Sequence, residues 1–353
     1  MSTRLSTHIL AESEFEEWDR FVSASPLGSI YSSSGYLKIL CSVTGATFRI
    51  LAVRRGDELA GGVGLYEVKT SSGTYVSTRL LLYYNGLVLR EYQTKYPSQR
   101  TARSLETMEA IEREIGSFGY TRVVLKNQGT FADARLFLDR GWSVRPTYTY
   151  VVPLADLDAL WNRLEQNLRR LINRCRQEEI QFTEDDDFSS FHAMHVQTVE
   201  RKGASLYLPQ DSFRRYFESL KSQQLCRLFH ARLPDGRSIA SQLVLLGPHF
   251  CAHTVSAAAD REFQQMGANA FLRWKVFEAL SAMGYTANDL TDAALGPVTH
   301  FKSQLGGDLA MCLVLTAPES ILARVYRTGR SVLRLGQCGI RKLQRMNPSR
   351  NQV

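Results

Sequence analysis

The chain has 353 residues, of which 44% are hydrophobic and 22% are charged, a composition typical of globular proteins. Its length allows two domains that each bury a core. The net charge of +8 comes from one end of the chain. Residues 320–353 hold eight basic side chains and no acidic one, which leaves 35 basic against 35 acidic side chains in residues 1–319. A neutral body with a basic tail argues against a DNA-coating surface and for a localised contact.

The beginning of the chain lacks the apolar segment of a secretory signal. No run reaches the roughly 18 apolar residues that cross a bilayer. We therefore expect a cytoplasmic protein. The six cysteines are scattered without the spacing of a zinc site or a disulfide framework, so we expect reduced, buried thiols and no metal.

Hydrophobic periodicity and turn residues predict a regular succession of elements in the first half of the chain. They are, in order, helices at 14–24 and 34–42, a β-hairpin at 48–68, a strand-like stretch at 70–90, a helix at 99–118, a strand at 121–126, a short helix at 135–140 and a strand at 143–153.

The second half opens with the strongest helical pattern, at 159–179, where the apolar residues fall within about 120° of arc. Its other sides carry arginines, among them Arg170 and Arg174. Two interpretations stay open for them, a solvated charged face or bidentate binding of a phosphate. The later predicted elements are helices at 191–201 and 211–222, strands between 226 and 256, a helix ending at 283, a strand at 286–290, a helix at 298–305 and a strand at 309–315.

The two halves contain the same unit. Gly119-Tyr120-Thr121 and Gly284-Tyr285-Thr286 each close an apolar helix and open a strand, and a further glycine follows 22 residues later in both, at Gly141 and Gly306. The hairpin at 49–62 also resembles that at 228–241. This period predicts tandem α/β domains at 1–153 and 154–318, each a mixed twisted sheet flanked by helices, with a basic tail at 319–353. Function is expected between them.

Gln264, Gly267 and Asn269 stand between a predicted strand and the helix that follows it. A glycine there lets backbone amides approach an anion at the helix N-terminus. The pattern resembles the pyrophosphate-binding loop of GNAT acetyltransferases, Gln/Arg-x-x-Gly-x-Gly/Ala, and departs from it at Asn269. An ordinary helix N-cap remains the alternative. The matching stretch Pro97-Ser98-Gln99 has no glycine, so only the second copy is expected to bind a donor.

With both copies considered, residues 10–315 resemble the FemAB-like acyl- and peptidyltransferases, tandem GNAT-fold proteins that include enzymes adding amino acids to peptidoglycan precursors. The motifs that carry the resemblance are Leu160-Trp161-x-x-Leu164, Arg169-Arg170-x-Ile172-x-x-Cys175, Thr198-Val199-Glu200-Arg201-Lys202-Gly203, Gly284-Tyr285-x-x-x-Asp289-Leu290 and His300-Phe301-Lys302-x-x-x-Gly306-Gly307. The resemblance implies that Lys302 lies at the reacting carbonyl with Phe301 packed beside it. It also implies that Arg201 and Lys38 contact phosphates of the acceptor.

The chemistry of acyl transfer suits a lysine in this role. An amine that attacks a thioester or ester builds negative charge on the carbonyl oxygen, and a preorganised cation or amide donor there contributes about 3 to 4 kcal/mol. Phe137 occupies the equivalent of Lys302 in the first copy, so we expect one active site per chain. Asp289 and Asp292, at the end of a predicted strand, are candidates for orienting the amine, with a loop or capping acid as the alternative for each. No nucleophile–base spacing predicts a covalent intermediate.

The expected function is transfer of an acyl or aminoacyl group from acyl-CoA or aminoacyl-tRNA to an amine of a phosphate-bearing glycan or glycopeptide precursor, with no permanently bound cofactor. The peptidyltransferases that the chain resembles often carry a long two-helix arm for tRNA. No coiled-coil-length insertion occurs here between 180 and 210, so the resemblance disfavours the tRNA donor. Residues 320–335 predict an amphipathic helix that docks on the first domain or attaches to an anionic membrane surface. The alternative function is a non-catalytic adaptor that binds glycolipid or membrane.

Overall fold

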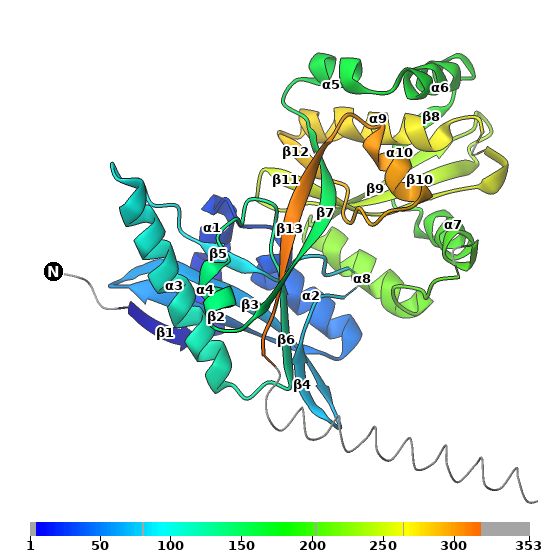
Figure 1. The fold of residues 1–353 in the computed structure, drawn as a ribbon. Helices are drawn as coiled ribbons and strands as arrows, with labels where there is room; N and C mark the ends of the chain where they lie inside the picture. The colour runs from blue at the N-terminus through cyan, green and yellow to red at the C-terminus, as the bar shows by residue number, and fades with distance from the viewer. Residues whose placement is uncertain (1–4, 80, 202, 264, 319–353) are drawn as a thin grey trace, which may run out of the picture.

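A computed structural model describes residues 5–79, 81–201, 203–263 and 265–318 (Figure 1). The predicted tail helix and Cys338 lie outside these residues. The first half consists of β1 (Leu5–Ile9), η1 (Glu12–Glu14), α1 (Phe15–Ala24), η2 (Ile30–Ser32), α2 (Ser34–Thr44), β2 (Thr47–Arg55), β3 (Glu58–Thr70), β4 (Gly73–Val76), β5 (Leu87–Leu89), α3 (Pro97–Ser117), β6 (Arg122–Lys126), α4 (Arg135–Asp139) and β7 (Ser143–Pro153).

The second half repeats this succession after two additional helices. It consists of α5 (Leu157–Arg163), α6 (Gln166–Gln177), β8 (Gln181–Glu184), α7 (Phe188–Arg201), α8 (Gln210–Ser222), β9 (Cys226–Arg232), β10 (Ser238–Leu245), β11 (Cys251–Ala259), η3 (Arg261–Phe263), α9 (Ala268–Ala282), β12 (Ala287–Asp289), α10 (Pro297–Ser303) and β13 (Asp308–Thr316). Each half contains an antiparallel hairpin, β2–β3 or β9–β10, and one parallel pair, β4–β6 or β11–β12. The predicted duplication and the α/β fold class are confirmed.

The two halves exchange their last strands. β7 ends the first half but pairs antiparallel with β12, while β13 ends the second half and pairs antiparallel with β6. β7 and β13 also pair with each other along nine residues, and they lie side by side through the middle of the molecule (Figure 1). The expected two sheets are therefore one continuous sheet of 13 strands.

The structure corrects one predicted element, because the helix at 159–179 is two helices. The backbone is extended at Leu164 and Glu165, where ψ is 141° and 138°. The Glu165 amide donates to the carbonyl of Gln304 at 3.1 Å, a bond that a continuous helix would not allow. The apolar positions on both sides of the break still enter one core cluster, so the periodicity predicted the buried face correctly and did not detect the interruption.

Burial agrees with the cysteine prediction for the part of the chain that is described. Cys41, Cys175, Cys226, Cys251 and Cys312 are all buried and free. Across the described residues, the helices are too short or too polar to cross a bilayer. A separate apolar cluster joins the halves through α2 and α8, where the hydroxyls of Tyr36 and Tyr216 are 2.8 Å apart.

The strand exchange makes a testable prediction about cooperativity. Leu315 of β13 is fully buried in the core of the first half, whereas Leu309 on the same strand is 56% exposed. We expect Leu315→Ala to lower the free energy of unfolding by about 2–5 kcal/mol. The loss should occur in one cooperative transition for both halves. Leu309→Ala is the matched control, with a change within about 0.5 kcal/mol. Two separated transitions in denaturant would contradict the prediction.

A second prediction concerns His230 on β9, whose side chain is buried and hydrogen-bonded to Ser241 at 2.7 Å. Burial lowers the pKa of His230 from 6.5 to about 4, against the opposing effect of Asp185. The unfolded chain therefore takes up a proton first, so stability is lost as the pH falls from 6.5 to 4. This fall in pKa corresponds to a loss of roughly 3 kcal/mol in the free energy of unfolding at low pH. In urea titrations at several pH values, His230→Gln should flatten this dependence, and an unchanged slope would refute the assignment.

Candidate active site

Lys302 lies on α10 with its side chain buried, and its ammonium contacts a backbone turn. The turn is formed by Thr291 and Asp292, just after β12. Nζ donates to the carbonyl of Asp292 at 2.7 Å and to that of Thr291. Both turn residues have positive φ, 48° and 59°, which is an uncommon conformation for side chains other than glycine. A strained turn thus presents two carbonyl oxygens to a buried cation, which is typical of functional sites. We call these three residues the lysine turn.

The carboxylate of Asp289 holds the lysine turn in place. It is buried at the end of β12. Oδ1 accepts from the backbone amide of Thr291 at 2.7 Å and from the hydroxyl of Thr149 on β7, while Oδ2 accepts from the hydroxyl of Tyr84 at 2.6 Å. Charge-assisted bonds of this kind are among the strongest in proteins. One carboxylate therefore connects the turn, the exchanged strand and the first half of the chain.

Aromatic rings surround this carboxylate. The ring of His253 on β11 has Nδ1 3.7 Å from Asp289 Oδ2, and its centroid lies 4.9 Å from that of Tyr31. Burial lowers the pKa of His253, and the nearby carboxylate only partly opposes this, so the ring is neutral at pH 7. Burial and the charge of Asp289 raise the pKa of Tyr84 well above its ordinary 10. Tyr84 therefore remains a protonated donor.

The site lies where two parallel strands separate. β12 pairs with β11 only from Cys251 to His253, whereas β11 continues to Ala259. At the point of separation, the Thr254 hydroxyl donates to Asn288 Oδ1 at 3.0 Å and accepts from Gln242 at 3.0 Å. Sites in α/β proteins collect at the carboxyl ends of parallel strands. The lysine turn occupies that end of β12.

Sequence reasoning did not detect the tyrosines that border the lysine turn. Tyr83 adjoins Thr291 of the turn and Tyr207, which lies in the loop between α7 and α8. Burial raises the pKa of Tyr83 well above 10 and also raises that of Tyr207. The only sequence signal was the tyrosine pair at 83–84 in a stretch without regular periodicity. Their convergence on the turn is a property of the three-dimensional fold.

The four predicted substrate-binding cations lie on three helices, α2, α6 and α7. Lys38 on α2 is exposed and lies 3.5 Å from Glu12. Arg201 is the exposed last residue of α7. Arg170 donates to Asn167 at 2.9 Å and Arg174 to Glu178 at 2.9 Å, both on the exposed surface of α6.

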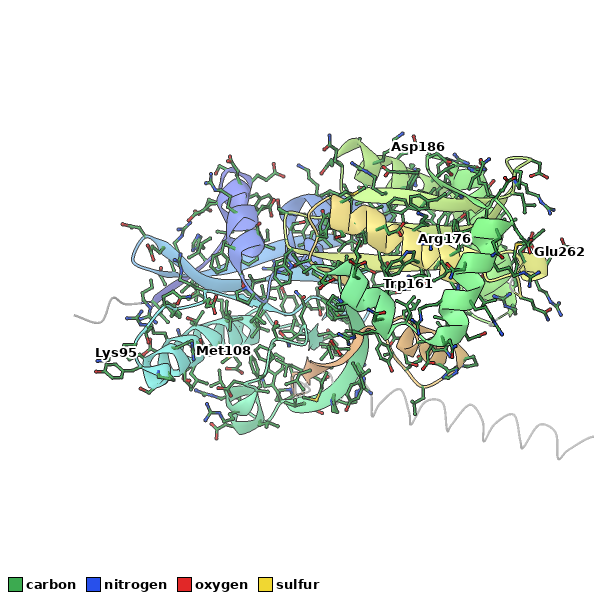
Figure 2. The ribbon with its side chains drawn as sticks, turned by 90° about the horizontal axis from the view of Figure 1, so that it is seen from above. Lys95, Met108, Trp161, Arg176, Asp186 and Glu262 are labelled. Atoms are coloured by element: carbon green, nitrogen blue, oxygen red, sulfur yellow. The ribbon has the colours of Figure 1, made fainter. Side chains whose placement is uncertain are left out.

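The predicted donor loop lies beneath α6. Gly267 has φ of 97° and precedes α9, and a Cβ there would lie 2.6 Å from Cβ of Leu171. Close approach of α6 therefore requires glycine, in addition to any role in anion binding. Figure 2 labels Trp161 and Arg176 on the two helices that cover α9; the guanidinium lies 5.3 Å from the Trp161 ring centroid. Gln264 lies outside the described residues.

Unpartnered polar atoms accompany this loop. Oδ1 of Asn269 is buried and has no hydrogen-bond partner among the described residues, and the same holds for Nε and Nη1 of Arg273 one turn later. Burial lowers the pKa of Arg273 to about 10, so it remains charged at pH 7. Phe301, next to Lys302 in the sequence, is partly buried and packs against the core of the second half. Over the described residues no group of three His, Cys, Asp or Glu side chains is arranged to hold a metal.

Comparisons with known proteins agree with this architecture. Residues 162–303 match the family described as an acetyltransferase (GNAT) domain, and no curated protein matches the chain. The structure of FemX is similar with a TM-score of 0.71 at 14% identity, covering 92% of this chain and 99% of that one.

Two other solved structures show the same likeness at lower scores. A C-terminal domain of a lysylphosphatidylglycerol synthetase from Agrobacterium fabrum has a TM-score of 0.55 at 10% identity, covering 90% and 96% of the two chains. A tandem GNAT protein from the clavulanic acid biosynthesis pathway has a TM-score of 0.52 at 12% identity, covering 90% and 99%. The chain therefore has the FemAB-like tandem GNAT fold, and its second half contains the segment that matches the GNAT acetyltransferase domain.

Proposed function

We propose that the protein is an acyltransferase that moves an acyl or aminoacyl group from acyl-CoA or aminoacyl-tRNA to an amine of a cell-wall or polysaccharide precursor. The observation that carries the proposal is the buried ammonium of Lys302, fixed by two carbonyls where β11 and β12 separate. The matching GNAT domain and the likeness to FemX support the reaction class.

Lys302 would stabilise the charge that develops during transfer. The amine nitrogen of the acceptor attacks the acyl carbon, a C–N bond forms, and the C–S or C–O bond to the donor breaks. The amine proton leaves with the departing thiolate or alkoxide, or to water. Negative charge appears transiently on the carbonyl oxygen, and a fixed cation in a water-poor site stabilises it strongly.

The cysteines of the site favour direct attack over a covalent enzyme intermediate. Cys251 and Cys312 are the thiols close to Asp289, and burial raises the pKa of both. Neither is a thiolate at neutral pH, and the thiolate is the nucleophilic form. Asp289, which already accepts from three donors, acts in this proposal as a positioning residue for the lysine turn.

Removal of the Lys302 charge tests the proposal. Lys302→Met keeps the apolar stem and its packing, and we expect kcat to fall about 10²- to 10³-fold. The purified protein is offered radiolabelled acetyl-CoA or aminoacyl-tRNA with amine-bearing wall precursors, and label in the acceptor is counted. Lys69→Met on the exposed part of β3 is the matched control and should keep full activity. If neither donor transfers label to an acceptor amine, the proposed reaction class is refuted.

A second prediction separates positioning from proton transfer at Asp289. Asp289→Asn replaces one of the two acceptor oxygens by an NH2 group, which would oppose a group that now donates to the carboxylate. We therefore expect both kcat and stability to fall, stability by about 2–3 kcal/mol. If the residue only positions the turn, the pH profile of kcat/KM keeps its shape. Tyr84→Phe removes one donor to this carboxylate and should lower the free energy of unfolding by about 1 kcal/mol. A profile that loses its acidic limb with unchanged stability would identify Asp289 as the general base instead.

A further inference from the structure

A pocket lies beside the lysine turn at the junction of the two halves. Its volume is about 450 Å³. The first half contributes the end of α2 and Arg79, and the second half contributes residues 206–209 and the start of α8. The residues that matter here are Thr44, Arg79, Leu206, Tyr207, Leu208 and Ser212.

Arg79 is the cation in the wall of this pocket. Its Nη1 donates to the hydroxyl of Tyr66 at 2.8 Å, while Nε is enclosed with no hydrogen-bond acceptor. Within the described part of the chain no carboxylate lies at ion-pair distance from it, in contrast to Arg49 nearby, whose Nε donates to Glu67 at 2.7 Å. The contact with Tyr66 replaces only part of the hydration that a partly buried guanidinium without a counter-ion loses. An anion in the pocket would supply the rest.

Two tyrosines lie between the pocket and the lysine turn. Tyr207 lines the pocket and adjoins Tyr83, and Tyr83 adjoins Thr291, whose carbonyl accepts from Lys302. A molecule held in the pocket therefore lies one pair of side chains away from the turn. The opposite wall is apolar, with Leu206 39% exposed beside the buried Leu208.

We propose that this pocket binds an anionic group of the acceptor, a carboxylate or a phosphate, with Arg79 as the residue that selects for the negative charge. The apolar wall would contact the uncharged part of the acceptor next to that group. The identification of the ligand as the acceptor depends on the proposed function, whereas the anion site itself does not.

Equilibrium binding tests the site independently of turnover. Pyrophosphate and glutarate are titrated into the full-length protein at low ionic strength by isothermal calorimetry, one probe for each anion class. Arg79→Gln should weaken the affinity for the probe at least 10-fold, since a charged hydrogen bond contributes about 1.5–3 kcal/mol. Ser212→Phe, which fills the pocket from its rim without changing Arg79, should do the same. Arg113→Gln, on the exposed face of α3, is the charge-matched control.

The outcomes separate this proposal from the previous one. Loss of binding in both pocket variants but not in the control supports the site, and the preferred probe tells phosphate from carboxylate. Failure of both probes to bind the wild-type protein, or equal loss in the Arg113 control, overturns it. With an active acceptor, the pocket variants should raise the KM for acceptor and leave the KM for donor unchanged. A wild-type protein that binds the probe through Arg79 but transfers nothing would refute only the enzymatic function.

Discussion

The buried carboxylate of Asp289 is the interaction on which the site depends. It accepts hydrogen bonds from Tyr84 in the first half, from Thr149 on the exchanged strand and from the amide of Thr291. Each donor comes from a different segment, so the carboxylate fixes those segments relative to one another. The strained lysine turn persists because its backbone is held from one side by Asp289 and from the other by the ammonium of Lys302.

The strand exchange explains why this carboxylate can reach both halves. Thr149 belongs to β7, which would lie far from β12 if each half kept its own last strand. The duplication also shows why the first copy has no equivalent site. Val124 occupies the position that matches Asp289, and Phe137 the position that matches Lys302. Phe137 is fully buried, and its ring centroid lies 5.2 Å from that of Trp142. In the first copy this position is therefore part of the hydrophobic core.

The sequence predicted what depends on local pattern. The hairpins, the helices α3 and α9 and the repeat follow from periodicity and glycine spacing, and the structure has them. Strand exchange was not predictable, because β13 has the same alternation whichever sheet it joins. The break at Leu164 depends on a hydrogen bond to Gln304, 139 positions further along the chain, which no periodicity contains. The place of the tyrosines at 83, 84 and 207 beside the turn was not predictable for the same reason, since only tertiary contacts bring them there.

The arrangement places one cation in the pocket and another at the turn, with tyrosines between them. Arg79 and Tyr207 line the pocket, Tyr83 adjoins both Tyr207 and Thr291, and Thr291 accepts from Lys302. Because Arg79 belongs to the first half and Lys302 to the second, their separation is set by how the halves pack. The exchanged strands and the buried carboxylate hold that packing fixed. An acceptor anchored by its negative group would then meet the attacked carbonyl at a constant distance, which lowers the entropic cost of bringing the two reactants together.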